Sequence, residues 1–388
     1  MNKTKPLGLH ITSDFPGPYS PMSVTVAIRD LVVGVSEVFN SAILVPRRTR
    51  KPIRTKIMKI RNELHIGLFD PVAALITNSW QRLDWINLVE TNLLSSVRPD
   101  FVHSHKLTYE ARIGDLLAKH YDIPHIITVR GSSDTHYRNH WPWNAHIYRN
   151  ILTRSHTNLW LSVWAKPFIN KRTGYRPSKK DIDFANAVPV HSLYTTSSRK
   201  LKRNALVCIC RLDDYEQKGI VALLRGFASA RSVIPDLTLD LIGPCGYPAR
   251  KILDTLISEC DLNNSVTWHG PMTRREVIER MSGYAAMILL SKNESFGLVY
   301  AEAVLSGIPI VYLRGSGVDG YDFANRYGIA CENLSVSSIQ TALIELSTRQ
   351  TALRDTIIAD RSSGSIDHLT SDGQAKLYSS VISSALKC

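Results

Sequence analysis

One stretch of this sequence constrains the fold more than any other. Two short apolar runs, residues 285–290 and 308–313, have the length and composition of buried strands, and the segment between them has helical character. Strand, helix and strand in this order form a βαβ unit, in which the two strands are parallel. The stretch therefore predicts an α/β domain built on an open parallel sheet.

Chemistry-bearing residues gather where the first of these strands passes into the helix. Residues 295–297 (Ser-Phe-Gly) permit a tight turn, and the unpaired amides of Gly297 to Val299 suit a phosphate group. Glu294 precedes the helix, and Glu302 lies eight positions later, a little over two turns away. Carboxylates accept hydrogen bonds from the vicinal hydroxyls of sugars and of ribose, so a nucleotide-sugar fits all three features. The alternative is an ordinary strand–helix turn with two solvated glutamates.

The length of the chain suits two domains. It has 388 residues, of which 44% are hydrophobic and 21% charged, as in globular proteins. Strands and helices alternate in both halves, and the segment between the halves is rich in Ser, Thr, Lys and Arg, which is typical of a linker. We therefore expect Rossmann-like domains at residues 1–190 and 205–370, a linker at 191–204 and a final helical segment at 371–388. In the first half the pattern predicts strands at 7–12, 41–46 and 101–105 and helices at about 23–38 and 79–97.

Two cations occupy matching places in the second half. Arg211 follows the strand expected at residues 205–210, and Lys218 precedes the next helix. Both side chains should lie over the groove at Gly297, where a departing diphosphate gathers negative charge. They would replace a metal ion there; the alternative is two solvated cations.

A metal centre finds little support in the sequence. His103 and His105 share a face of one strand, but no third ligand is in view beside them. The six cysteines include one Cys-x-Cys pair, Cys208 and Cys210, and no second pair completes a zinc site. We expect reduced thiols and neither metal nor cofactor.

Three consecutive motifs resemble the Glu-x7-Glu signature of the retaining GT-B glycosyltransferases, most closely glycosyltransferase family 4. They are residues 293–299 (Asn-Glu-Ser-Phe-Gly-Leu-Val), 301–304 (Ala-Glu-Ala-Val) and 306–311 (Ser-Gly-Ile-Pro-Ile-Val). The resemblance continues at residues 99–105 and 123–132 and at the turns of Arg211 and Lys218. It implies the GT-B fold, in which two Rossmann-like, doubly wound α/β domains face a central cleft and the last helix packs back on the first domain.

The resemblance also implies roles for the matching residues. Glu294 would hold the hydroxyls of the donor sugar and Glu302 the ribose, while His105 would contact the donor sugar and orient it rather than ionise, and His103 would be structural. The donor diphosphate would be bound by Arg211, Lys218 and the amides of Phe296, Gly297, Leu298 and Val299, with further amides offered by residues 315–317. Gly17, Arg130 and Gly131 would belong to the acceptor or cleft loops. The family's usual Gly-Gly pair in the first loop is replaced here by Tyr-Ser-Pro-Met-Ser at residues 19–23.

Together with these features, the resemblance implies a retaining, metal-independent glycosyltransferase. It would move a sugar from a nucleotide-diphosphate sugar to a hydroxyl of a glycan or lipid-linked acceptor, in the assembly of cell-envelope polysaccharide or lipid-linked oligosaccharide. One alternative is a nucleotide-sugar epimerase of the same fold, which releases free nucleotide and an epimerised sugar without an acceptor. Another is a non-catalytic nucleotide-sugar-binding protein, which the missing Gly-Gly pair favours.

The charge of the chain is concentrated in its first half. The formal net charge is +13, and residues 1–190 hold 26 Lys and Arg against 14 Asp and Glu. Residues 47–61 carry eight cations and no acid, beside apolar residues that include Ile57, Met58, Ile60 and Leu64. Such a basic amphipathic segment can lie on anionic lipid, and the alternatives are a solvated loop and a phosphate-rich acceptor site.

Other partners and places are less well supported by the sequence. No motif of a nucleic-acid-binding fold occurs, so we expect no nucleic acid. No apolar run reaches the length of a signal-peptide core or of a membrane span. The predicted location is therefore the cytoplasm, with possible peripheral contact at the inner face of the cytoplasmic membrane.

Overall fold

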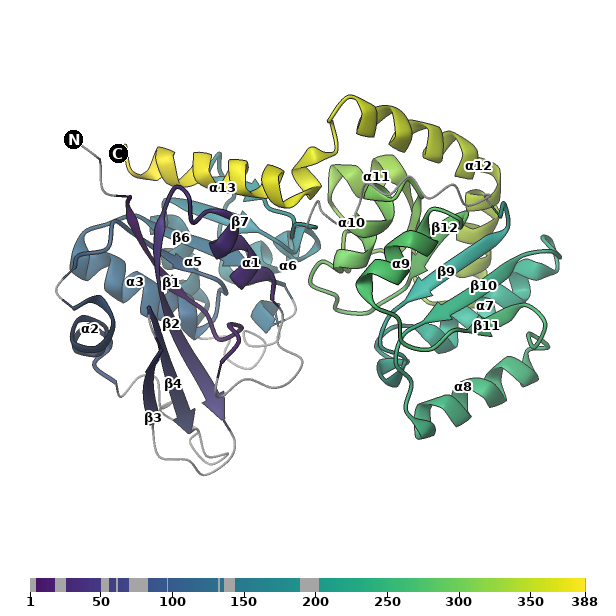
Figure 1. Cartoon of the computed structure of the whole chain (residues 1–388), viewed down its shortest axis with the longest axis horizontal. Coiled ribbons are helices and arrows are strands. Elements are labelled where there is room, and N and C mark those ends of the chain that lie inside the picture. The colour runs from purple at the N-terminus through teal and green to yellow at the C-terminus, as the bar shows by residue number, and fades with distance from the viewer. Residues whose placement is uncertain are drawn as a thin grey trace. The chain divides into compact units, whose positions relative to one another are not determined.

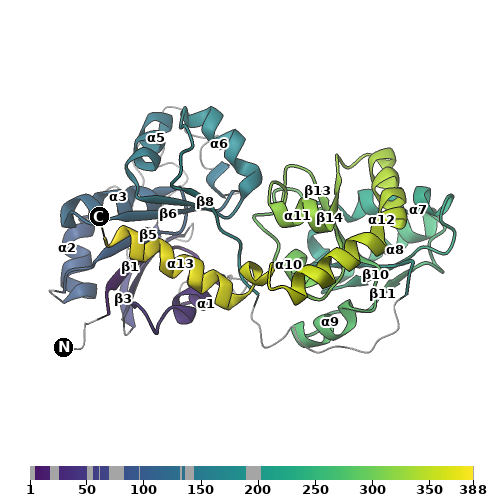
Figure 2. The ribbon, with the colours of Figure 1, turned by 90° about the horizontal axis from the view of Figure 1, so that it is seen from above.

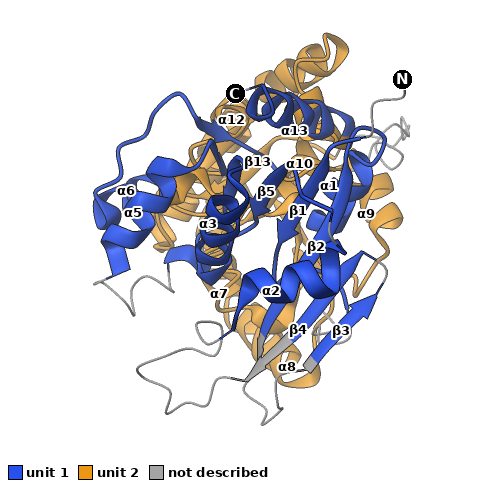
Figure 3. Ribbon diagram, turned by 90° about the vertical axis from the view of Figure 1, so that its left-hand side faces the viewer, with its two compact units in different colours: residues 1–161, 166–185, 372–388 blue, residues 162–165, 186–371 orange. Residues whose placement is uncertain are grey.

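The structure, a computed structural model, describes residues 5–17, 26–49, 56–60, 62–69, 83–95, 97–131, 133–135, 144–188 and 202–387. It divides into two compact units (Figure 3). Unit 1 comprises residues 1–161, 166–185 and 372–388, and unit 2 comprises residues 162–165 and 186–371. Residues 191–201 of the expected linker and the loop at 19–23 lie outside the described residues.

Unit 1 contains an eight-stranded sheet with helices on both faces (Figure 1). Its strands lie in the order β3-β4-β2-β1-β5-β6-β7-β8, and every neighbouring pair is parallel except β3 with β4. The strands are β1 (Leu7–Ile11), β2 (Asn40–Thr49), β3 (Lys56–Ile60), β4 (Glu63–Phe69), β5 (Phe101–Ser104), β6 (His125–Val129), β7 (Thr157–Trp160) and β8 (Asp181–Asp183). The helices are α1 (Ala27–Gly34), α2 (Trp85–Val89), α3 (Tyr109–Tyr121), α5 (Ala145–Arg154) and α6 (Lys166–Thr173).

The last helix, α13 (Ser371–Ala385), crosses the sheet of unit 1 (Figures 1 and 2). Its buried side chains Tyr378, Val381 and Ile382 share a core cluster with residues of β5, β6 and β7 and with Leu31 of α1. The opposite face of the sheet packs against α2 and α3. Both faces are thus covered, as a mostly parallel sheet requires.

Unit 2 contains a six-stranded, fully parallel sheet in the order β11-β10-β9-β12-β13-β14. Its strands are β9 (Ala205–Ile209), β10 (Thr238–Ile242), β11 (Val266–Trp268), β12 (Ala286–Leu289), β13 (Ile310–Leu313) and β14 (Gly328–Cys331). Its helices are α7 (Ile220–Arg231), α8 (Tyr247–Glu259), α9 (Arg274–Met281), α10 (Leu298–Leu305), α11 (Asp322–Tyr327) and α12 (Val336–Ser362). The predicted βαβ unit is present as β12, α10 and β13. The chain is therefore α/β with a doubly wound parallel sheet in each unit, as the sequence predicted.

Three local expectations in unit 1 need correction. The helix expected at about 23–38 is described only from Ala27 and ends at Gly34, because Val35 already leaves helical geometry and turns its side chain into the core. Residues 79–82 and 96 of the helix expected at 79–97 lie outside the described residues. The described part is a single turn, α2, that continues as a π-helical turn at Glu90–Leu94 and stops at Ser95 with φ 48°.

The basic segment at residues 47–61 is also different from the expectation, because its described part belongs to the sheet. It contributes the end of β2 and all of β3, which pairs with β4 at the sheet edge. Arg47 is 9% exposed and donates hydrogen bonds to the carbonyl oxygens of Ser13 and Phe15, and Leu64 lies in the core. Residues 50–55 and 61 lie outside the described residues.

Candidate donor-binding site

The candidate donor site of unit 2 lies where its strand order reverses. β9 and β12 are neighbours in the sheet but distant in sequence, and ligands of open α/β sheets bind outside the carboxyl ends of such strands. The turn after β9 and the turn after β12 meet there, because the amide of Lys292 donates to the carbonyl of Gln217 at 2.7 Å. Gly219 makes this approach possible: it has φ 69°, and a Cβ at this position would lie 2.4 Å from the Leu290 oxygen.

This approach joins two of the predicted site residues. Lys218 Nζ donates to Glu294 Oε2 at 2.7 Å, and the Ser291 hydroxyl donates to the same oxygen at 3.2 Å. Both side chains of the ion pair are about one-fifth exposed, at 18% and 20%. Such a charge-assisted bond fixes the orientation of the carboxylate while leaving it within reach of a ligand.

The start of α10 offers backbone donors beside Glu294. Gly297 is its N-cap with φ 77°, and the amides of Phe296, Gly297, Leu298 and Val299 find no acceptor within the described part of the chain. The Phe296 ring is buried against Tyr321, which anchors the turn. Unpaired amides at a helix start attract anions, as the sequence predicted for this turn.

Residues that the sequence did not single out hold this turn from behind. The Ser162 hydroxyl donates to the Ser295 carbonyl at 2.6 Å, and the Trp164 indole donates to the Glu294 carbonyl at 2.9 Å. The Glu294 amide donates to the Ser316 hydroxyl, which in turn donates to the Ser291 carbonyl at 2.6 Å. Nothing in the local sequence around Ser162 indicates this contact, because it joins segments more than 130 positions apart.

The expectation that residues 315–317 offer free amides to a ligand is wrong for two of them. The Gly315 amide donates to Asp319 Oδ2 at 2.8 Å, and the Gly317 amide donates to the Glu294 carbonyl at 3.0 Å. These donors stabilise the loop itself, so the backbone donors at this end of the sheet come from the α10 turn.

The second signature glutamate, Glu302, lies inside α10 and is 8% exposed. Burial raises the pKa of its carboxyl, and the Arg274 guanidinium, with Nη2 2.7 Å from Oε1, acts in the opposite direction. Glu302 is therefore not one of two solvated glutamates. Its carboxylate is held by a cation from another helix.

The other predicted cation, Arg211, is not part of the Lys218–Glu294 ion pair. The Arg211 side chain is 54% exposed, and its nearest ion-pair partner in the described part of the chain is Asp213, 3.7 Å away. It follows β9 as predicted, and its side chain is accessible to solvent.

Histidine and acidic clusters of unit 1

The predicted histidine of unit 1, His105, belongs to a buried cluster of three histidines. The register of β1 and β5 places His10 opposite His103, and His105 lies two positions further along. All three side chains are fully buried, and their candidate ligand atoms lie within 4.8 Å of one another. His10 is the third residue that sequence reasoning missed; the available signal was a histidine within an otherwise apolar buried strand.

The three histidines belong to a buried hydrogen-bonded network. His103 already uses both ring nitrogens, bonding the Tyr378 and Thr128 hydroxyls at 2.8 Å each, and His10 Nδ1 lies 3.1 Å from His105 Nε2. Burial lowers the pKa of His10 to about 4 and that of His105 well below its usual range, and Arg130 and Lys106 add positive charge near His105. His105 Nδ1 has no partner among the described residues.

An acidic and basic cluster lies beside the histidines at the carboxyl ends of β1 and β5. Lys106 Nζ donates to Asp14 Oδ1 at 2.7 Å, and Glu110 Oε1 accepts hydrogen bonds from the amide and hydroxyl of Ser13 at 2.9 and 2.7 Å. Glu110 is fully buried, and its Oε2 has no partner among the described residues. The order of strands also reverses here, between β1 and β5, so the cluster lies where unit 1 would bind a ligand.

The predicted loop residues of unit 1 lie at different distances from this cluster. Arg130 Nε donates to the His105 carbonyl at 3.0 Å, and the Arg130 amide donates to Asp134 Oδ2 at 2.6 Å. Gly131 follows with φ 70°. Gly17 lies instead against the His65 ring, where a Cβ would come within 2.1 Å of a ring carbon. The structure therefore groups Arg130 and Gly131 with His105 and places Gly17 on another side chain.

Glu110 should make the stability of unit 1 depend on pH. Burial raises the pKa of Glu110 to about 7, whereas the unfolded chain has the ordinary value of 4.5. Between these values the folded protein binds the extra proton, so the free energy of unfolding falls as the pH rises, by up to about 3 kcal/mol. Glu110→Gln cannot ionise and should lack this contribution. Urea unfolding at about pH 5 and about pH 8 should show a steeper loss for the wild type than for the variant.

The matched control is Glu37→Gln, which changes an exposed glutamate of the same unit. It should follow the wild-type pH dependence. If Glu110→Gln and the wild type differ by the same free energy at both pH values, the ionisation of Glu110 is not coupled to folding.

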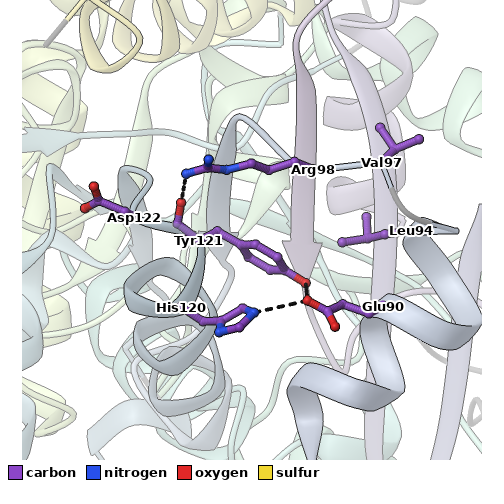
Figure 4. A pocket seen from close by; sticks show the side chains of 7 residues that line it. All are labelled: Glu90, Leu94, Val97, Arg98, His120, Tyr121 and Asp122. Atoms are coloured by element: carbon purple, nitrogen blue, oxygen red, sulfur yellow. Dashed lines mark hydrogen bonds and ion pairs between the residues drawn. The ribbon is translucent and has the colours of Figure 1, made fainter.

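A pocket of about 610 Å³ in unit 1 is far from the predicted chemistry (Figure 4). It is lined by Glu90, Leu94, Val97, Arg98, His120, Tyr121 and Asp122. Arg98 precedes β5, and Tyr121 ends the helix before β6, so the pocket lies at the amino ends of these strands. Glu90 contacts His120 and the Tyr121 hydroxyl, and Arg98 donates to the Tyr121 carbonyl (Figure 4). Ligands of open α/β sheets bind at the opposite edge.

Comparison with known proteins shows which sequences and structures this chain resembles. Residues 196–361 match the family model "Glycosyl transferases group 1". The D-inositol 3-phosphate glycosyltransferase of Arthrobacter sp. (strain FB24) is 32% identical over 114 residues, covering 29% of this chain and 27% of the relative. An uncharacterized glycosyltransferase of Methanocaldococcus jannaschii is 24% identical over 294 residues, 74% of each chain. The first match thus spans about a quarter of its relative's length.

Solved structures extend the similarity to the whole chain. The structure of Anabaena HepE in complex with UDP superposes with a TM-score of 0.66 at 14% identity, covering 98% of this chain and 100% of that one. At this identity the likeness concerns the fold, which is that of the GT-B glycosyltransferases. Residues 196–361 are therefore similar to the glycosyl transferases group 1 model, within a chain of GT-B fold.

Proposed function

We propose that this protein is a retaining glycosyltransferase that moves a sugar from a nucleotide-diphosphate sugar to a hydroxyl acceptor. The observation that carries the proposal is the convergence of Lys218, Glu294 and the unpaired amides of the α10 turn at the carboxyl ends of β9 and β12. Glu294 would accept hydrogen bonds from the donor sugar, and Glu302 from the ribose. The UDP bound to HepE supports a nucleotide-sugar as donor.

The proposed chemistry follows from the charges at this site. As the bond between sugar and phosphate breaks, negative charge grows on the leaving diphosphate, where Lys218, Arg211 and the amides of residues 296–299 would stabilise it without a metal ion. Glu294 is engaged with Lys218, so we do not assign it the role of a covalent nucleophile. We therefore propose attack from the face that the diphosphate leaves, through an oxocarbenium-like state, with the departing phosphate accepting the acceptor's proton.

His105 would contact the donor sugar, and the loops of unit 1 would serve the acceptor side of the reaction. The lowered pKa of His105 keeps the ring neutral, which suits orientation by hydrogen bonding rather than proton transfer. Arg130, Gly131 and the Asp14–Lys106 pair would contribute to binding a glycan or lipid-linked acceptor, and Gly17 would shape the neighbouring loop. The pathway proposed is cell-envelope polysaccharide or lipid-linked oligosaccharide assembly in the cytoplasm.

A donor screen tests the proposed function. Purified protein is incubated with UDP-, GDP- and ADP-sugars, with and without membrane extract, and release of the nucleoside diphosphate is measured. We expect release that depends on the extract, a product with the donor's anomeric configuration by NMR, and no loss of activity with a chelator. Release of an epimerised free sugar without acceptor would instead indicate an epimerase, and binding without turnover a non-catalytic protein.

Contact with anionic lipid through residues 47–61 remains part of the proposal. None of the helices that the structure describes has the length and apolar character needed to span a bilayer. On the edge strand β3, however, Ile57, Met58 and Ile60 are 45%, 42% and 39% exposed. Vesicles containing phosphatidylglycerol should sediment the wild type at low salt, and replacing Ile57 and Met58 by serine should weaken this binding because apolar area is lost. Equal sedimentation of both proteins would exclude β3 as the contact.

A further inference from the structure

We propose that Arg274 is a positioning residue for Glu302 and that the two side chains together recognise the ribose of a ribonucleoside diphosphate. This inference rests on the proposed function of the site. Arg274 Nη2 lies 2.7 Å from Glu302 Oε1. The Arg274 side chain is 40% exposed while that of Glu302 is 11% exposed, so the guanidinium lies nearer the solvent than the carboxylate it contacts.

The start of α9 holds Arg274 in this position. Thr273 caps the helix, because its side-chain oxygen accepts a hydrogen bond from the Glu276 amide. In return, the Glu276 carboxylate accepts hydrogen bonds from the Thr273 amide and hydroxyl at 2.7 Å each. This reciprocal cap fixes the first turn of α9, and Arg274 is its first residue. α9 packs against α10, the helix that carries Glu302.

In the Arg274–Glu302 pair, one carboxylate oxygen contacts the guanidinium and the other is left for a ligand. Oε1 of Glu302 is occupied by the guanidinium, and no partner of Oε2 occurs among the described residues. Oε2 can therefore accept a hydrogen bond from one hydroxyl of the ribose. The guanidinium has five donors, so Arg274 can donate to the oxygen of the neighbouring hydroxyl while keeping its bond to Glu302. A vicinal diol satisfies both groups, whereas a deoxyribose satisfies only part of the site.

The same contact keeps Glu302 in the form that can accept. α10 packs against α9, β12, β13 and α12, and Arg274 is the charged group on these elements that acts on the pKa of Glu302. Burial alone raises this pKa and favours the protonated carboxyl. Removing the cation should therefore raise it further, and the loss of ribose binding should grow as the pH falls.

Isothermal titration with UDP, GDP, ADP and their 2′- and 3′-deoxy forms tests the inference. For the diphosphate that the wild type binds, Arg274→Gln should lower affinity about tenfold at neutral pH. The loss should be larger at about pH 5.5 and smaller at about pH 8.5, and the preference for ribose over deoxyribose should shrink. Arg274→Lys should restore part of the affinity because it restores the charge. The matched control is Arg275→Gln, the next residue of α9, whose side chain is 87% exposed and paired with Glu279.

The possible outcomes are distinct. If Arg274→Gln binds as tightly as the wild type, or if its loss is the same at every pH and for the deoxy forms, the positioning role is wrong. If the wild type binds none of the diphosphates, the proposed function fails at the donor site itself, whatever Arg274 does.

Discussion

Replacing Glu294 by glutamine should lower turnover at least about a hundredfold, because two charge-assisted hydrogen bonds of roughly 1.5–3 kcal/mol each are lost or weakened. The carboxylate accepts from Lys218 and Ser291 in the free protein and would accept from the donor sugar in the complex. Glutamine has the shape of glutamate but no negative charge. If its NH2 group takes the place of Oε2, it faces the Lys218 ammonium with a second donor. Steady-state rates of nucleoside diphosphate release measure the effect.

The control for this variant is Glu279→Gln on α9, which removes an exposed carboxylate of the same unit. It should leave turnover unchanged. Thermal unfolding of both variants separates loss of chemistry from loss of fold, since Glu294 is also part of the turn's support. If Glu294→Gln keeps its rate constant and its Michaelis constant within about threefold of the wild type, the sugar-binding role proposed here is wrong.

Much of the fold follows from local sequence pattern. The apolar runs at residues 285–290 and 308–313 became β12 and β13 around α10, because short apolar runs bounded by turns have few other uses in a chain of this length. The alternation of strands and helices from residue 205 onwards could be predicted in the same way. The strands within residues 47–61 were not predicted, because the edge hairpin of β3 and β4 depends on pairing that periodicity does not encode.

The site was predictable only where its residues are close in sequence. Glu294 and the turn at residues 296–299 lie within one motif, and Lys218 follows a strand end that any parallel sheet would bring nearby. His10 beside His103, and Arg274 beside Glu302, depend on strand register and on helix packing. Neither is visible in a single sequence, because the partners are tens of positions apart and each residue alone is ordinary.

The burial of acidic side chains could not be predicted from the sequence either. Glu110 looks like a common residue in the first turn of a helix, and its complete burial comes from the strands and the Ser13 turn packed around it. The same is true of Glu302, whose neighbours in α10 are all apolar. For both acids the altered pKa is a product of tertiary packing, so it could be stated only from the structure.

Lys218→Met should reduce turnover about a hundred- to a thousandfold, the usual loss when one donor to a developing negative charge is removed. Lys218 is held against Glu294 by the Gln217–Lys292 backbone bond, so its charge is already in place before a ligand binds. Its loss also leaves the Glu294 carboxylate without a neighbouring cation, and this unpaired negative charge repels a diphosphate. Affinity for the nucleoside diphosphate should fall with it and become less dependent on salt.

Arg211→Met provides the informative comparison, because the two cations differ in how they are held. Arg211 is 54% exposed and lies 3.7 Å from Asp213, so a bound ligand would have to order its side chain, which then loses conformational freedom. We expect about a tenfold loss of diphosphate affinity, smaller than for Lys218, and no change in the stability of the free protein. Lys251→Met, on the exposed face of α8, is the control and should bind as the wild type does. A larger loss for Arg211→Met than for Lys218→Met would mean that the preformed pair of Lys218 and Glu294 is structural and that the diphosphate is held elsewhere along the turn after β9.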